Sequence, residues 1–122
     1  MANINFKLFG NPTITENGKE IYLPPGKVSA LLYYILLKKV VSRDEAAAIF
    51  WGRSNENRAK VSLRNAIYKI KRAFGEDVIE TPNKTILSIN DKLDIFVDVI
   101  EFEKDPINNL NLYKGDFWEA FI

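Results

Sequence analysis

The 122-residue sequence contains no cysteine and no histidine. Without these side chains the chain has no disulfide, no thiolate nucleophile, no imidazole base and none of the usual zinc ligand sets. Aspartate and glutamate occur, but no paired carboxylates, glycine-rich phosphate loop or Ser/Lys constellation stands out at a productive spacing. The sequence therefore predicts a protein that is not an enzyme and that uses no metal and no cofactor.

Long apolar runs are also missing. The longest, Val28 to Leu37, is far shorter than the roughly 20 residues that a membrane-spanning helix needs. The first residues lack the charged segment and apolar core of a signal peptide, so we expect none. These absences predict a cytoplasmic protein that does not contact a membrane.

The formal net charge of +1 hides an uneven distribution. Residues 1–90 carry 14 lysines and arginines against 8 acidic residues, whereas residues 91–122 carry 3 against 8. A basic body with an acidic end is compatible with nucleic-acid binding through the body, and ordinary surface charge is the alternative.

One segment, Arg58 to Gly75, combines an apolar stripe with a basic face. The stripe recurs at i, i+3, i+4, i+7 and i+11 and consists of Leu63, Ala66, Ile67, Ile70 and Phe74. The opposite face carries Arg58, Val61, Asn65, Tyr68, Lys69 and Arg72. No acidic residue occurs between Asn57 and Gly75. The pattern predicts a helix that packs on a core through one face, offers the other to a polyanion, and is followed by Gly75 as a suitable terminator.

The residues before this segment predict a small sheet and two helices. Short alternating runs up to Leu23 indicate antiparallel strands, with a two-residue turn at Asn17-Gly18. Helical spacing predicts a core helix from Lys27 to Lys39. After a brief extended link at Val40-Val41, residues 42–45 have the form of a capping box and predict a short helix to Phe50.

The residues after Gly75 predict a β-hairpin and an acidic tail. Val78-Ile79 and residues 86–89 are strand-like and flank the turn-forming residues 81–85. Beyond Asn90 the pattern weakens to short helical pieces, one around residues 96–102 and another over 112–121. Sheet, helix, capped helix, basic helix and hairpin, in this order, predict a winged helix-turn-helix.

Four segments resemble one known family, the OmpR/PhoB-type winged helix of bacterial transcriptional activators of the SARP and BTAD-containing class. Residues 41–52, VSRDEAAAIFWG, are similar to its VSRDEL…LWG segment. Residues 59–75 are similar to its recognition-helix pattern ARxNLRxALYRLRRALG. Residues 4–10 resemble its first strand, and residues 112–117, LYKGDF, resemble the LYxGDF piece of the activator domain that follows.

The resemblance implies an α+β winged helix-turn-helix with an N-terminal antiparallel sheet, three helices and a C-terminal β-hairpin wing. We expect this domain over residues 1–92, followed by a short helical acidic tail at 93–122 that is the possible start of a truncated activator domain. The implied function is sequence-specific binding of double-stranded DNA by a bacterial transcription regulator, with helix 58–74 in the major groove. RNA polymerase and a second copy on direct repeats are further candidate partners.

The residues expected to face DNA combine the basic helix, the start of the short helix and the hairpin turn. They are Arg43, Arg58, Val61, Ser62, Asn65, Tyr68, Lys69, Arg72, Lys84 and Thr85. Arginine can pair bidentately with guanine, asparagine with adenine, and lysine with phosphate. For each position the alternative is an ordinary solvated surface. Arg64 and Lys71 flank the stripe, and we expect ion pairs with nearby helices there rather than phosphate contacts.

Two other functions compete with DNA binding. Residues 81–87, TPNKTIL, depart from the family's wing, which commonly has a Gly-Tyr-Arg/Lys-Leu run after a threonine. This departure motivates the alternative of a winged-helix protein-interaction module without DNA binding, in which the tail and an apolar patch around Trp118 would contact a partner. An enzyme is the third and least favoured hypothesis.

Overall fold

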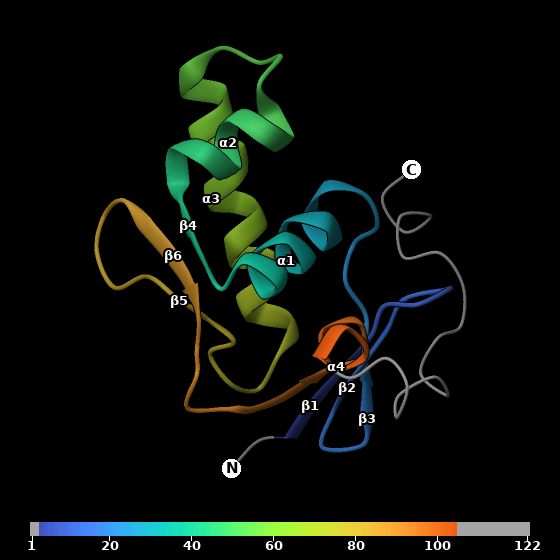
Figure 1. Ribbon diagram of the computed structural model, residues 1–122. Helices are drawn as coiled ribbons and strands as arrows, with labels where there is room; N and C mark the ends of the chain where they lie inside the picture. Colours follow the sequence, from blue (N-terminus) through green and yellow to red (C-terminus); the bar gives the residue numbers. More distant parts are fainter. Residues whose placement is uncertain (1–2, 105–122) are drawn as a thin grey trace. The chain divides into compact units, whose positions relative to one another are not determined.

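Residues 3–104, as described by the computed structural model, fall into two units that each contain a sheet (Figure 1). One unit is contiguous, Leu23–Asn90, and the other joins residues 3–22 to residues 91–104. Four helices and two sheets occur in this part of the chain, which confirms the α+β class. The predicted count of three helices is wrong, because a fourth helix, α4 (Asp98–Lys104), is present. It overlaps the predicted helical piece around residues 96–102, whose first two residues lie in a strand instead.

The sheet of the discontinuous unit is mixed rather than antiparallel. Its strands are β1 (Asn3–Lys7), β2 (Thr13–Glu16), β3 (Lys19–Ile21) and β7 (Asp94–Val97), in the order β3-β2-β1-β7. The first three pair antiparallel as predicted. β7 pairs parallel with β1, with Ile4 opposite Ile95. The prediction of a purely antiparallel sheet is therefore wrong, since local patterns do not reveal a partner strand so distant in sequence.

The turn between β2 and β3 follows the predicted chemistry. Asn17 has φ 51° and Gly18 has φ 83°, the two consecutive positive values that a type I′ turn needs. The Asn17 side chain also accepts a 2.8 Å hydrogen bond from the backbone N–H of Asn3. The turn is thus fixed both by its backbone and by a contact to β1.

A buried carboxylate links β1 to α4. Asp98, the first residue of α4, is only 3% exposed. Its Oδ1 accepts a 2.8 Å hydrogen bond from the N–H of Leu8, and its Oδ2 accepts a 3.4 Å bond from the N–H of Phe9. The rings of Phe9 and Phe102 meet edge to face at 5.5 Å. The carboxylate therefore satisfies two backbone donors that follow β1 and fixes the start of the helix beside them.

The contiguous unit combines three helices with a three-stranded sheet. Along the chain its elements are α1 (Lys27–Lys38), β4 (Val40–Ser42), α2 (Arg43–Trp51), α3 (Glu56–Ala73), β5 (Ile79–Glu80) and β6 (Ile86–Ile89). The sheet is antiparallel throughout, in the order β4-β6-β5. The predicted extended link at Val40-Val41 is thus a strand that pairs with the predicted hairpin. The core of the contiguous unit includes Leu31, Leu32, Ile35, Leu36, Leu63, Ile70 and Leu87.

Contacts between α1 and α2 fix the entry to α2. The Tyr34 hydroxyl donates a hydrogen bond to the Glu45 carboxylate, and this bond raises the pKa of Tyr34. The rings of Tyr34 and Phe50 meet edge to face at 5.8 Å. Phe50 and Trp51, which the sequence suggests as core residues, are only half-buried. The two helices are therefore joined partly through exposed polar and aromatic contacts.

Ser42 caps α2 as predicted, since its Oγ accepts a 3.0 Å hydrogen bond from the N–H of Glu45. Replacing Ser42 with alanine removes this acceptor and leaves a first-turn donor unpaired. We expect the free energy of unfolding to fall by about 1 kcal/mol. Urea denaturation measures this change, and Ser42→Asn, which retains a capping oxygen, should recover most of it. An alanine variant as stable as the parent chain would contradict the role of the cap.

Several predictions fall on residues outside the described part of the chain. These are the helical piece at 112–121, the LYKGDF resemblance at 112–117 and the apolar patch around Trp118. The proposed domain boundary after residue 92 also stays a prediction. Among residues 3–104, no helix has both the length and the apolar character needed to cross a bilayer.

Candidate functional site

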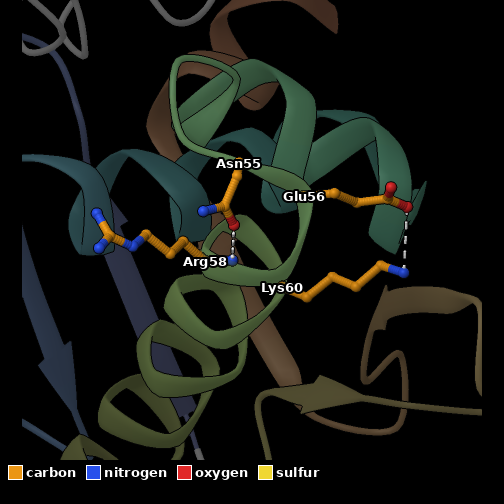
Figure 2. A network of polar contacts seen from close by, with 4 residues as sticks. All are labelled: Asn55, Glu56, Arg58 and Lys60. Carbon is orange, nitrogen blue, oxygen red and sulfur yellow. Dashed lines mark hydrogen bonds and ion pairs between the residues drawn. The ribbon is translucent and has the colours of Figure 1, made fainter.

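The helix α3 begins earlier than the sequence pattern suggests. Asn55 caps it, with its Oδ1 accepting a 2.9 Å hydrogen bond from the N–H of Arg58 (Figure 2). Glu56 lies in the first turn, and Lys71 and Arg72 lie in the last. The charges at both ends therefore interact favourably with the helix dipole and stabilise the helix. The predicted start at Arg58 is therefore two residues late.

The C-terminal end of α3 also differs from the prediction. The helix ends at Ala73, and Phe74 follows in an extended conformation with φ −106° and ψ 151°. Gly75 is not among the residues with positive φ, so it does not supply the left-handed turn that often follows a helix. Instead, the residue that follows the last turn of α3 is Phe74, whose side chain is buried.

The two faces of α3 are as different as predicted. All five residues of the apolar stripe, from Leu63 to Phe74, are buried, and Ala59 joins them. This burial confirms the predicted helical spacing of the apolar residues. Because one face of the helix is buried, the residues on the opposite face point outward. On α3, the exposed residues among those predicted to face DNA are Arg58, Val61, Asn65, Tyr68, Lys69 and Arg72, and Ser62 is half-buried.

The centre of the exposed face is a line of four side chains. Val61, Asn65, Tyr68 and Arg72 follow one another at i, i+4, i+7 and i+11. Tyr68 is 60% exposed, and the Arg72 guanidinium lies 5.6 Å from the centre of its ring. Arg72 Nη1 is 3.5 Å from the Tyr68 hydroxyl oxygen, to which it donates. The aromatic ring therefore lies against the cation and limits where it can reach.

The flanks of this line are basic on both sides. At 100° per residue, Arg58 and Lys69 lie on one flank, and Lys60, Arg64 and Lys71 lie on the other. The second flank borders a groove of about 480 Å³. The groove is formed by the start of α2, by α3 and by the turn between β5 and β6, and its lining residues are Ser42, Arg43, Asp44, Lys60, Leu63, Arg64, Lys84 and Thr85.

The groove brings together predicted residues from separate parts of the chain. Arg43 begins α2, and its N–H donates a 2.8 Å hydrogen bond to the backbone oxygen of Thr85. Asn83 Oδ1 accepts from both the N–H and the hydroxyl of Thr85, at 2.8 and 2.9 Å, and so fixes the turn that carries Lys84. The three predicted residues Arg43, Lys84 and Thr85 therefore line one groove.

The charges in the groove are strongly unbalanced. Four of its lining side chains are cationic, Arg43, Lys60, Arg64 and Lys84, and one is a carboxylate, Asp44. The Nε of Arg43 is buried and has no hydrogen-bond partner in the described part of the chain. Neighbouring cations repel one another, and an anion bound among them offsets this repulsion. The chemistry of the groove therefore suits a phosphate or another oxyanion.

Lys60 is shared between this groove and the start of α3. Its Nζ lies 3.3 Å from Oε1 of Glu56, one turn earlier on the helix (Figure 2). Both side chains are largely exposed, so the ion pair contributes little to stability, on the order of 0.3–0.5 kcal/mol. Lys60 can therefore exchange this carboxylate for an incoming anion at small cost.

Two groove cations were missed or misassigned on sequence grounds. The sequence pattern gives no prediction for Lys60 and predicts an ion pair for Arg64, as it does for Lys71. Within residues 3–104, neither Arg64 nor Lys71 forms an ion pair with a carboxylate, so that prediction is wrong for both. The signal was present in the spacing, because Lys60 and Arg64 are four residues apart and share a flank with Lys71.

No protein-family model matches this chain, and no curated protein matches it. The functional argument therefore depends on the residues of α3 and of the groove. Residues 3–104 contain no group of three or more aspartate or glutamate residues placed to hold a metal ion. Anion recognition by α3 and the adjoining groove is what this arrangement can do chemically.

Proposed function

We propose that this chain is the DNA-binding module of a bacterial transcription regulator, and that residues 23–90 form a winged helix-turn-helix of the OmpR/PhoB type. In this proposal α2 and α3 are the helix pair and the β5–β6 hairpin is the wing. The order α1, β4, α2, α3, β5, β6 supports the assignment (Figure 1). The observation that carries it is the exposed face of α3, which is basic and has no carboxylate after Glu56.

The helix α3 would enter the major groove of double-stranded DNA. The line from Val61 to Arg72 extends over about 16 Å, which corresponds to roughly five base-pair steps. Asn65 is suited to adenine N6 and N7, and Arg72 to guanine O6 and N7. Arg58 and Lys69, on the flank, are suited to phosphates or to guanine. These residues would supply the sequence preference.

The cationic groove beside α3 would hold the phosphate backbone. Arg43, Lys60, Arg64 and Lys84 would neutralise phosphates, and the N–H groups in the first turn of α2 would add donors. Contacts of this kind fix the register of the protein on the duplex without reading sequence. The groove would therefore contribute affinity, and the centre of α3 would contribute discrimination.

The test is selection from a pool of random duplexes, followed by titration at several salt concentrations. We expect the protein to retain duplexes that share a sequence motif, and the logarithm of the binding constant to fall with the logarithm of salt by about 0.9 for each neutralised phosphate. Lys69→Ala/Arg72→Ala should lose discrimination. Equal binding of all duplexes by the parent protein and this variant would contradict the proposal and favour the protein-interaction module.

Glu56→Gln is expected to strengthen binding to any duplex about twofold at low salt. The substitution removes a carboxylate 3.3 Å from the Lys60 ammonium, so Lys60 no longer has to leave an ion pair of about 0.3–0.5 kcal/mol. Fluorescence anisotropy with a labelled duplex measures the change. In a Lys60→Gln background the same substitution should give a smaller gain, and an equal gain would show that Glu56 does not act through Lys60.

A further inference from the structure

Val61 is an exposed apolar residue in the middle of a polar helix face. Its exposure is 48%, whereas the stripe on the other side of α3 is buried. Valine is a weaker helix former than the lysine, arginine and alanine that surround it, because its β-branch restricts χ1. Neither burial within residues 3–104 nor helix propensity therefore accounts for a valine at this position.

The position of Val61 defines what it can contact. It lies one turn before Asn65 on the central line of α3, about 6 Å along the helix axis. Among the base edges in the major groove, the C5-methyl of thymine is the apolar group, and small apolar side chains contact it. The two methyls of valine are held in one strongly preferred rotamer in a helix, so little side-chain freedom is lost on contact.

We propose that Val61 is a specificity-determining residue that contacts the C5-methyl group of a thymine in the bound DNA. This inference rests on the proposed function and adds one feature to it, the identity of a base that hydrogen bonding does not read. The thymine lies within about two base pairs of the base that Asn65 contacts, since 6 Å of helix corresponds to about two base-pair steps. Val61 thus distinguishes thymine from cytosine and uracil by a methyl group.

The experiment replaces single thymines by deoxyuridine in a duplex selected by the parent protein. Deoxyuridine pairs as thymine does and lacks only the methyl group. We expect one position at which the replacement weakens binding about fourfold, which is the transfer free energy of one buried methyl, about 0.8 kcal/mol. With Val61→Ala the same replacement should change binding by less than about 1.5-fold. With Val61→Ile the deoxyuridine replacement should again weaken binding, as it does in the parent protein.

The outcomes separate this inference from the proposed function. Selective DNA binding with the same deoxyuridine effect in the parent protein and in Val61→Ala would overturn the contact and leave DNA binding in place. The same holds if deoxyuridine has no effect at any thymine. Failure to select any duplex would overturn both. Because Val61 is exposed, the alanine variant should fold as the parent does, which circular dichroism checks.

Discussion

Replacing Arg43, Lys60, Arg64 and Lys84 together by glutamine should weaken binding to every duplex by on the order of a thousandfold at about 0.15 M salt. Each neutralised phosphate contributes about 0.9 to the salt slope, so the loss of four contacts lowers the slope by about 3.6. These four side chains line one groove, and the lining of the groove includes a single carboxylate, that of Asp44. The duplexes that bind best should remain the same, because phosphate contacts carry no sequence information.

A matched variant separates the position of these charges from their number. The control replaces four exposed lysines that do not line the groove, Lys7, Lys19, Lys27 and Lys39. It changes the net charge by the same amount, and we expect a far smaller loss of affinity with a nearly unchanged salt slope. Equal losses in the two variants would mean that net charge, and not the groove, attracts DNA.

Removing the Asp98 carboxylate should have the largest effect on stability among the predictions made for this chain. With Asp98→Ala we expect the free energy of unfolding to fall by about 3 kcal/mol, since hydrogen bonds to a charged group contribute about 1.5–3 kcal/mol and buried donors lose their acceptor. The N–H of Leu8, 2.8 Å from Oδ1, and the more distant N–H of Phe9 would both lose this acceptor. Asp98→Asn should be nearly as destabilising, because an amide offers one oxygen and turns its N–H₂ group toward a second donor.

The measurements are urea denaturation and hydrogen exchange at the amides of Leu8 and Phe9. Exchange at these two positions should become faster in both variants, which reports the loss of the contact at its own site. Asp94→Asn is the control, since Asp94 is an exposed carboxylate in the neighbouring strand β7. If Asp98→Ala were as stable as this control, the buried carboxylate would have no part in holding β1 to α4.

Features that depend on near neighbours in sequence could be predicted. The stripe from Leu63 to Phe74 is buried, because helical spacing alone determines which residues share a face. The Asn17-Gly18 turn and the Ser42 cap are present, because each depends on residues within one turn of the chain. For the same reason the exposed residues of α3 could be named in advance.

Features that depend on residues far apart in the sequence could not be predicted. Strand β7 adds to β1 in parallel, and β4 adds to β6, and neither pairing has a local signature. The basic groove is a further example, because Lys84 reaches it from the hairpin turn and Arg43 from α2. The helical spacing predicts on which flank of α3 Arg64 lies, but it does not predict the neighbours of Arg64, so the predicted ion pair is wrong. Their positions follow from tertiary packing.

The parallel pairing of β1 with β7 has a consequence for how the chain folds during synthesis. The residues of β1 are made well before those of β7, their parallel partner, because all of Leu23–Asn90 is translated between the two strands. The contiguous unit can therefore close its own core while β1 still lacks a neighbour on one side. We expect a nascent chain stopped before residue 91 to protect the amides of α3 from exchange and to leave those of Leu8 and Phe9 open.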